Sequence, residues 1–180
     1  MFIVFLGNRK TKKALGKLAN YLPGALSKSP FDASYKGNYQ GLNFSVSLIS
    51  GEKNRLKGLY INIYKSSFLN LVIYNEKSKE KSLTIFSERI GRIQEVKTND
   101  ETFDREFFIL SNDAQKAMNY LNNSARKQII TELFTEGFDA IAIDSKKLSL
   151  QKRKYDLSKD FDPQRMNGAL QRLNALASGI

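Results

Sequence analysis

Histidine and cysteine are both absent from this chain of 180 residues. Their absence excludes Ser-His-Asp and Cys-His catalysis, together with zinc, haem and iron–sulfur sites built from the usual ligands. Phosphate-binding glycine loops are missing as well. Gly7, Gly16 and Gly24 are spaced too widely for a dinucleotide fingerprint, and no G-x-x-x-x-G-K-[ST] sequence occurs. No cofactor is therefore expected, and catalysis is not the leading interpretation.

A long apolar run is missing at the N-terminus. The chain begins with the six apolar residues Met1–Leu6, whereas a membrane-spanning helix takes about 20. A signal peptide carries its charges before the apolar stretch, but here the charges follow it. Residues 1–8 are therefore interpreted either as the first strand of the domain or as the cytoplasmic end of a membrane helix whose remainder precedes Met1.

Acidic residues are missing from positions 1–30, although the chain contains 18 of them. The same positions hold six of the 29 basic residues, so they carry +6 of the net charge of +11. The other +5 is spread over positions 31–180, and a lysine-rich composition explains it as well as a partner does. The concentrated charge needs a separate explanation, such as an anionic partner.

A basic amphipathic helix is predicted from Arg9 to Leu22, with Asn8 as its N-cap and Pro23-Gly24 as its end. Apolar and basic side chains occupy opposite arcs of this helix. The apolar arc consists of Ala14, Leu15, Leu18, Ala19, Tyr21 and Leu22. The basic arc is the predicted contact with a membrane or another polyanion, and it consists of Arg9, Lys10, Lys12, Lys13 and Lys17.

A basic helix beside an apolar end is typical of the cytoplasmic face of a membrane. Each lysine or arginine near an anionic leaflet contributes about 1 kcal/mol, so five contribute up to roughly 5 kcal/mol. Alternatively, the apolar arc packs on the domain and the basic side chains only face water. The two interpretations are compatible, because the basic arc is exposed in both.

The rest of the chain is predicted to contain a linker and one folded domain. Serine and proline at Ser27, Ser29 and Pro30 indicate a linker over residues 25–34. Residues 1–24 are then the apolar end and the basic helix, and residues 35–180 are a single α+β domain.

Strict alternation of apolar and polar residues predicts antiparallel strands that are joined by hairpins and have one buried face. The hairpins between Tyr39 and Phe86 are expected to form the centre of the sheet. The predicted strands cover residues 42–48, 59–64, 69–74, 83–86, 106–111, 138–144 and 148–153.

Helices are predicted in the second half of the chain. One spans residues 114–121 after an Asn112-Asp113 cap, a second begins at Ser124 and ends at Gly137, and a third begins at Asp162-Pro163. The third is amphipathic and is expected to lie across the sheet. Its apolar stripe is Met166, Ala169, Leu170, Leu173, Leu176 and Ala177. The fold class is therefore α+β, an antiparallel sheet built from hairpins with helices packed on one face.

A second basic and aromatic set favours a different partner, a nucleic acid. Basic residues interleaved with aromatic ones are typical of surfaces that bind single strands. Tyrosines on alternate positions of neighbouring strands form such a stacking platform, although tyrosine pairs also stabilise a solvated sheet face. The set consists of Lys152, Arg153, Lys154, Tyr60, Tyr64 and Tyr74.

The densest acidic stretch contains Asp100, Glu101, Asp104 and Glu106. A carboxylate cluster of this kind binds a hard cation in some enzymes, which leaves a metal-dependent enzyme as a third class of function. The spacing of a calcium loop is absent, and a turn that opens at Asn99-Asp100 explains the same residues structurally. The structural explanation is preferred, and no metal is expected.

One segment, Asn99–Asp113, resembles a pattern in bacterial families of unknown function that carry a membrane-anchored, cytosolic α+β domain. The basic helix and Tyr39-Gln40-Gly41 before a strand resemble the same families. The matching residues of the segment and the helix after it are Phe103, Asp104, Arg105, Phe107, Asn112, Asp113 and Leu121. The resemblance implies a domain beside the inner membrane and implies no reaction.

The Phe-Asp-Arg motif itself is interpreted as structural. Phe103 and Phe107 are expected to be core anchors on either side of the strand entry. Asp104 is expected to accept backbone N–H groups in the turn, and Arg105 to pair with a nearby acid.

These observations together predict a non-enzymatic, membrane-proximal domain for assembly or binding, on the cytoplasmic side of the bacterial inner membrane. Its expected partners are an anionic membrane surface or a membrane protein. The alternative is a soluble cytoplasmic protein that binds a nucleic acid or another polyanion.

Overall fold

The structure is a computed structural model that describes residues 3–27, 33–49, 58–76 and 93–180. Its described part is a nine-stranded antiparallel sheet with five α-helices, which confirms the predicted α+β class. The helices are α1 (Ile3–Gly16), α3 (Glu101–Glu106), α4 (Ala114–Leu121), α5 (Ser124–Thr135) and α6 (Pro163–Ala177), with a 3-10 turn η1 (Lys17–Asn20) after α1. The strands are β1 (Gly24–Leu26), β2 (Ser34–Tyr39), β3 (Leu42–Ile49), β4 (Gly58–Tyr64), β5 (Leu71–Asn75), β6 (Gln94–Glu95), β7 (Phe107–Ser111), β8 (Ala140–Ile143) and β9 (Lys147–Lys152).

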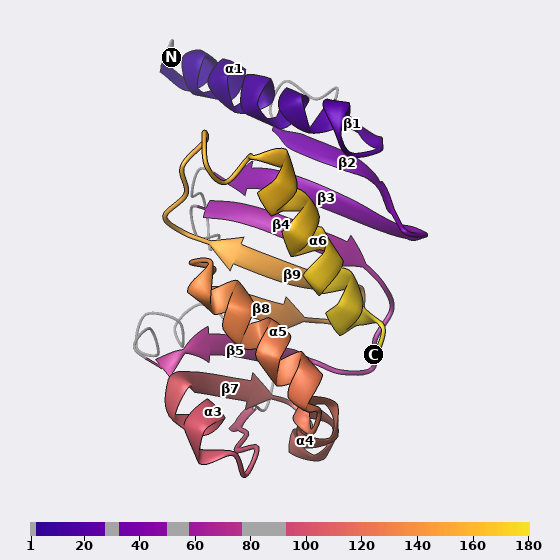
Figure 1. The fold of residues 1–180 in the computed structure, drawn as a ribbon, viewed down its shortest axis with the longest axis vertical. Coiled ribbons are helices and arrows are strands. Elements are labelled where there is room, and N and C mark those ends of the chain that lie inside the picture. The colour runs from indigo at the N-terminus through magenta and orange to yellow at the C-terminus, as the bar shows by residue number, and fades with distance from the viewer. Residues whose placement is uncertain (1–2, 28–32, 50–57, 77–92) are drawn as a thin grey trace.

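The strand order is β1-β2-β3-β4-β9-β8-β5-β7-β6 (Figure 1). The predicted hairpins β3–β4 and β8–β9 are confirmed. The prediction that the segments from Tyr39 to Phe86 form the centre of the sheet is wrong, because β4 and β5 do not pair with each other. The β8–β9 hairpin lies between them, and its β9 is the middle strand. The predicted strand 83–86 lies outside the described residues.

A tight turn joins β2 to β3. Tyr39 and Leu42 are cross-strand partners, and the two residues between them, Gln40 and Gly41, have φ angles of 50° and 86°. Two successive positive φ angles are typical of the type I′ hairpin turn, and glycine adopts this conformation without steric cost. The turn therefore fixes the register of the first hairpin.

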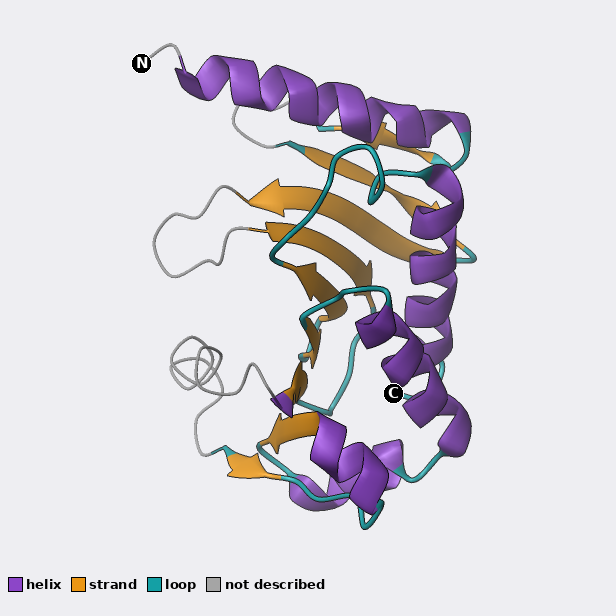
Figure 2. Cartoon of the chain, turned by 60° about the vertical axis from the view of Figure 1, so that its left-hand side comes forward, coloured by secondary structure: helices purple, strands orange, loops and turns teal. Residues whose placement is uncertain are grey.

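The helices lie on one face of the sheet, where the main hydrophobic core is enclosed (Figure 2). Helix α6 contacts β4 and β9 and packs beside α5. All six residues of its predicted stripe are buried, as expected for a docked helix. A smaller apolar cluster lies on the opposite face of the sheet and consists of Val72, Tyr74, Phe108, Leu110 and Ala140.

Helix α1 contacts β1 and β2 and lies at one end of the long axis of the molecule (Figure 1). It starts at Ile3, so the prediction of a first strand at residues 1–8 is wrong for the described residues, and Asn8 lies inside the helix instead of capping it. A short apolar run fits a helix and a strand equally well, which explains the error. Two of the three residues of β1, Ala25 and Leu26, and the first residue of β2, Ser34, fall within the segment predicted as a linker.

Among the side chains that the structure describes, Ala14 and Leu15 of α1, Leu18 of η1 and Leu22 after it are buried. The Tyr35 hydroxyl secures the end of this segment, because it donates a hydrogen bond of 2.6 Å to the Leu22 carbonyl oxygen. Ala19 and Tyr21, which were predicted on the same apolar arc, are exposed. The 3-10 turn at Lys17–Asn20 has about three residues per turn, which shifts these two side chains away from the sheet.

Candidate functional site

The basic arc of the N-terminal helix is exposed. Arg9, Lys10, Lys13 and Lys17 are exposed and Lys12 is half-buried, so the structure places the predicted contact residues on one helical segment. Arg9 and Lys13 lie four residues apart on α1, so their side chains lie along one stripe of the helix, and Lys17 begins η1 directly after it. The stripe is presented to solvent because the apolar side of the segment is already packed on the sheet.

Little in the described part of the chain neutralises this basic arc. Arg9, Lys10, Lys13 and Lys17 form no ion pair with any residue that the structure describes. Elsewhere in the described chain some basic side chains, such as Lys127 and Arg153, pair with carboxylates. Others, such as Arg126, form no ion pair with a described residue. The four cations Arg9, Lys10, Lys13 and Lys17 attract phosphate or carboxylate groups without selecting their chemistry. The chemical capacity of the basic arc is therefore electrostatic binding.

The tyrosines of the nucleic-acid alternative share the sheet face that is opposite to the helices, but they differ in exposure. Tyr64 is 43% exposed and its hydroxyl shares a hydrogen bond with the Ser45 hydroxyl. Tyr60 is half-buried. Tyr74 is 2% exposed, and its burial raises the pKa of its hydroxyl above the ordinary range. A stacked base needs an exposed ring face, which Tyr74 does not offer.

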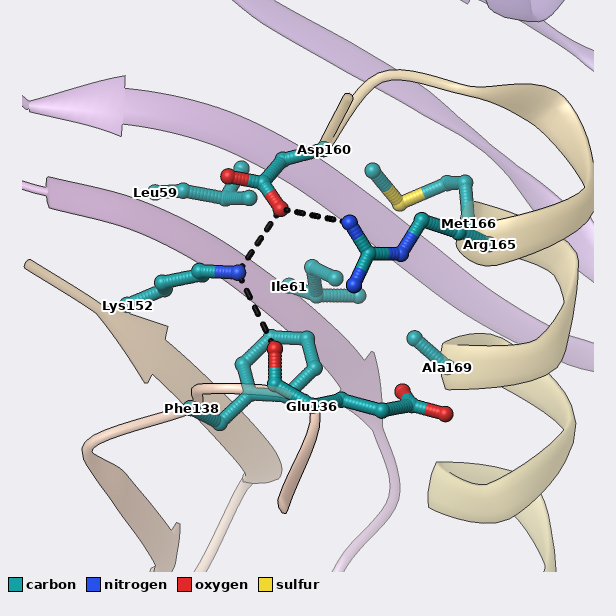
Figure 3. A pocket seen from close by; sticks show the side chains of 9 residues that line it. All are labelled: Leu59, Ile61, Glu136, Phe138, Lys152, Asp160, Arg165, Met166 and Ala169. Carbon is teal, nitrogen blue, oxygen red and sulfur yellow. Dashed lines mark hydrogen bonds and ion pairs between the residues drawn. The ribbon is translucent and has the colours of Figure 1, made fainter. Parts of the chain in front are cut away.

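The basic residues of that alternative do not gather beside the tyrosines. Lys152 follows Leu148 and Leu150 on β9, and it points with them toward the helices (Figure 3). Its ammonium donates to Asp160 Oδ1 at 2.7 Å and to the Glu136 carbonyl oxygen at 3.1 Å.

The surroundings of Lys152 leave no room for a ligand. The side chains of Lys152 and Asp160 are only 12% and 8% exposed. The cavity beside them measures about 10 Å³, which is the space of a single water molecule. Arg153 pairs with Asp139 at 3.3 Å, and Lys154 alone of the three basic residues is exposed. The structure therefore distributes the predicted nucleic-acid residues over both faces of the sheet.

The Phe-Asp-Arg motif lies in α3, a short helix that the sequence analysis described only as a turn. Phe103 and Phe107 are both buried, with ring centroids 4.7 Å apart. Asp104 accepts hydrogen bonds from the Thr98 backbone N–H and from the Thr98 hydroxyl, at 2.9 Å each. Arg105 is exposed and forms no ion pair with a described residue, so the pairing expected of it with a nearby acid is not found. Phe103 and Phe107 pack in the core, and Asp104 accepts hydrogen bonds within the fold.

Helix α3 is capped at its N-terminus by Asp100, whose side chain accepts a hydrogen bond of 3.1 Å from the Phe103 N–H. The hydrogen bond from Lys127, at 2.8 Å, and that from Phe103 hold the pKa of the Asp100 carboxyl below its ordinary value. An Asx cap followed by Glu101 is the signal that predicts this helix start. In the part of the chain that the structure describes, no group of three or more acidic side chains is arranged to hold a metal ion.

A recess of about 320 Å³ is a feature that the sequence analysis did not predict. Phe68 stands beside it and is 96% exposed. The sequence signal is limited to Phe68 itself, an aromatic residue placed after two serines in the connection between two strands.

No protein-family model matches the chain, and no curated protein matches it. Among solved structures, the chain is similar in fold to the crystal structure of the mycobacterial trehalose monomycolate transport factor A, TtfA. The TM-score is 0.60, and the match covers 95% of this chain and 92% of the other at 7% sequence identity. At that identity the likeness shows a shared α+β fold. Within the described ranges, no helix has the length and apolar character needed to cross a membrane.

Proposed function

We propose that this chain is a non-enzymatic, membrane-associated domain that contacts anionic head groups at the cytoplasmic surface of the bacterial inner membrane. The contact is made by the basic arc of α1 and η1. The observation that carries the proposal is the exposed, unpaired row Arg9, Lys13 and Lys17 on a helix whose apolar side is already packed.

The expected affinity is modest and electrostatic. Each exposed cation near an anionic leaflet contributes about 1 kcal/mol, so the four exposed ones contribute up to roughly 4 kcal/mol. That energy corresponds to a dissociation constant of about 1 mM, which gives reversible contact and not stable anchoring. The basic arc therefore orients a domain that something else brings to the membrane, such as a partner protein.

The likeness in fold to a transport factor supports a role in assembly or binding. The absence of histidine and cysteine also supports a function without catalysis. Binding of a nucleic acid is less well supported, because its candidate residues lie on both faces of the sheet and Lys152 is engaged with Asp160.

Co-sedimentation with lipid vesicles tests the proposal. The protein should bind vesicles of phosphatidylcholine mixed with phosphatidylglycerol and should not bind pure phosphatidylcholine. Binding should weaken sharply between low and physiological salt, because the screening length falls to about 8 Å. The triple variant Lys10→Gln, Lys13→Gln, Lys17→Gln should lose roughly a hundredfold in affinity, since each charge is worth about 1 kcal/mol.

A matched control removes the same charge elsewhere. Lys146, Lys154 and Lys159 are all exposed, so their joint replacement by Gln changes the net charge equally without touching α1. This control variant should bind vesicles like the unaltered protein. Equal losses in both variants, or no vesicle binding at low salt, would overturn the proposal. The nucleic-acid alternative would be favoured if the protein bound single-stranded RNA more tightly than vesicles and if the control variant lost this RNA binding.

A further inference from the structure

A single aromatic ring projects into solvent from the connection between β4 and β5. Phe68 is 96% exposed, whereas its neighbours Ser67 and Leu69 are 8% and 6% exposed. The Ser67 hydroxyl accepts a hydrogen bond of 2.9 Å from the Leu69 N–H, and the Ser67 N–H donates to the Ser145 carbonyl oxygen at 3.3 Å. Hydrogen bonds therefore hold the backbone of Ser67 and Leu69 on both sides of Phe68, and this backbone directs the Phe68 ring into solvent.

The recess of about 320 Å³ beside Phe68 has walls from distant parts of the chain. Helix α4 contributes Tyr120, whose hydroxyl donates a hydrogen bond of 2.9 Å to the Leu176 carbonyl oxygen of α6. Arg126 of α5 stacks over the Tyr120 ring at 4.5 Å and donates to the Tyr120 carbonyl oxygen at 2.7 Å. These bonds hold the walls in place, so the recess is preformed.

The lining combines apolar surface with positive charge. Phe68, Leu69 and Ile180 supply the apolar part, and Lys116 and Arg126 supply two cations. No acidic side chain lines the recess in the described structure, although Lys116 reaches Asp113 at 3.1 Å just outside it. Arg126 forms no ion pair with a described residue. The chemistry complementary to this lining is an apolar group next to a carboxylate.

We infer that the recess beside Phe68 docks a segment of a partner protein that presents an apolar side chain next to an aspartate or glutamate. An exposed aromatic ring with an adjacent arginine is the combination that dominates binding energy in protein interfaces. The recess is open on one side, whereas an acyl chain needs an enclosed apolar cavity. It also lies near α4 and the C-terminus, away from α1 along the long axis (Figure 1). A membrane that contacts α1 therefore leaves it facing the cytosol.

Selection from a displayed library of short random peptides tests the inference, with the full chain as bait. The enriched peptides should carry Asp or Glu within two positions of Leu, Phe or Trp. Synthetic copies of these peptides should bind the unaltered protein, and Phe68→Ser should weaken the binding by about tenfold or more. Lys116→Gln should weaken it by a smaller factor, because Lys116 is shared with Asp113.

Two controls separate this inference from other outcomes. Tyr21 is also aromatic and 67% exposed, but it lies beside α1, so Tyr21→Ser should leave peptide binding unchanged. Phe68→Ser removes no buried surface, so its thermal unfolding and its vesicle binding should match the unaltered protein. The inference would be overturned if the Phe68→Ser variant, used as bait, enriched the same peptides. Enrichment of basic peptides by the unaltered protein, or its binding of dodecanoate without any peptide, would also overturn it.

Discussion

The strength of the ion pair between Lys152 and Asp160 can be measured by mutation. A strong, buried pair means that Lys152 is not available to a ligand. The Asp160 carboxylate accepts from Lys152 through Oδ1 at 2.7 Å and from the Asp156 backbone N–H through Oδ2 at 2.8 Å. Arg165 lies 3.6 Å from Oδ1 (Figure 3). We consider the substitution Asp160→Asn, which preserves the size of the side chain.

The expected cost follows from the arrangement of donors. Asparagine has one acceptor oxygen and one donating amide, but Asp160 faces a donor on each side. The amide NH₂ of the asparagine then faces either the Lys152 ammonium or the Asp156 N–H, so one of these two donors has no acceptor. The two side chains of the ion pair are only 12% and 8% exposed, so water compensates little. Breaking a buried pair on one side costs about 3–5 kcal/mol, and the partly exposed Arg165 makes the lower end appropriate.

Urea unfolding followed by circular dichroism and tyrosine fluorescence measures this cost, since the chain contains no tryptophan. The matched control is Asp113→Asn in the Asp113–Lys116 pair, whose side chains are 36% and 59% exposed. The control should change the free energy of unfolding very little, because an ion pair between exposed side chains is screened by water. If Asp160→Asn costs no more than this control, the pair is open to solvent and Lys152 is free to contact a ligand.

Two further predictions concern the core and the α3 motif. Leu173→Ala should lower the free energy of unfolding by about 2–5 kcal/mol, because Leu173 is fully buried and leaves a cavity. The exposed neighbour change Gln171→Ala should have almost no effect on the melting temperature, and equal shifts would mean that α6 is not docked. Asp104→Ala should cost about 1–2 kcal/mol by leaving the Thr98 donors without their acceptor. Vesicle and peptide binding should persist in Asp104→Ala; their loss at unchanged stability would assign the motif to a binding site.

The parts of the fold that the sequence predicts are those in which one physical signal dominates. The apolar stripe of α6 starts after an Asp-Pro cap, and Asp162 does accept hydrogen bonds from the Gln164 and Arg165 N–H groups. Alternation along residues 42–48 and 59–64 predicts β3 and β4 because the apolar side chains of each strand lie on one face, in the main core. In these elements the local sequence pattern and the burial in the folded protein favour the same secondary structure, so tertiary contacts do not override the local preference.

The elements that were missed lack such a dominant signal. Strand β2, with the sequence SYKGNY, has no buried residue after Tyr35, since Lys36 and Asn38 are exposed and Gly37 and Tyr39 are half-buried. Its pairing with β3 is what makes it a strand. The direction of Lys152 could have been predicted. It continues the alternation of Leu148 and Leu150, which places it on the buried face of β9, and its charge alone suggested a surface residue.

The exposed recess beside Phe68 was beyond prediction, because its walls come from α4, α5 and the residues after α6. No spacing in the sequence relates Phe68 to Arg126 before the strand order is known. The basic arc required only a helical period, and four of its five residues are exposed although the predicted helix start was wrong.

The position of the β8–β9 hairpin between β4 and β5 has a consequence for synthesis. A ribosome releases the chain from its N-terminus, so β4 and β5 are complete by Asn75, well before their shared partner begins at Ala140. During that interval each of the two strands has an unpaired edge, and such edges bind other strands. The two halves of the sheet join only after Lys152 has emerged, and α6 covers them last. Folding of this domain is therefore governed by contacts distant in sequence, and a protein with this strand order depends on the growing chain being kept from premature pairing.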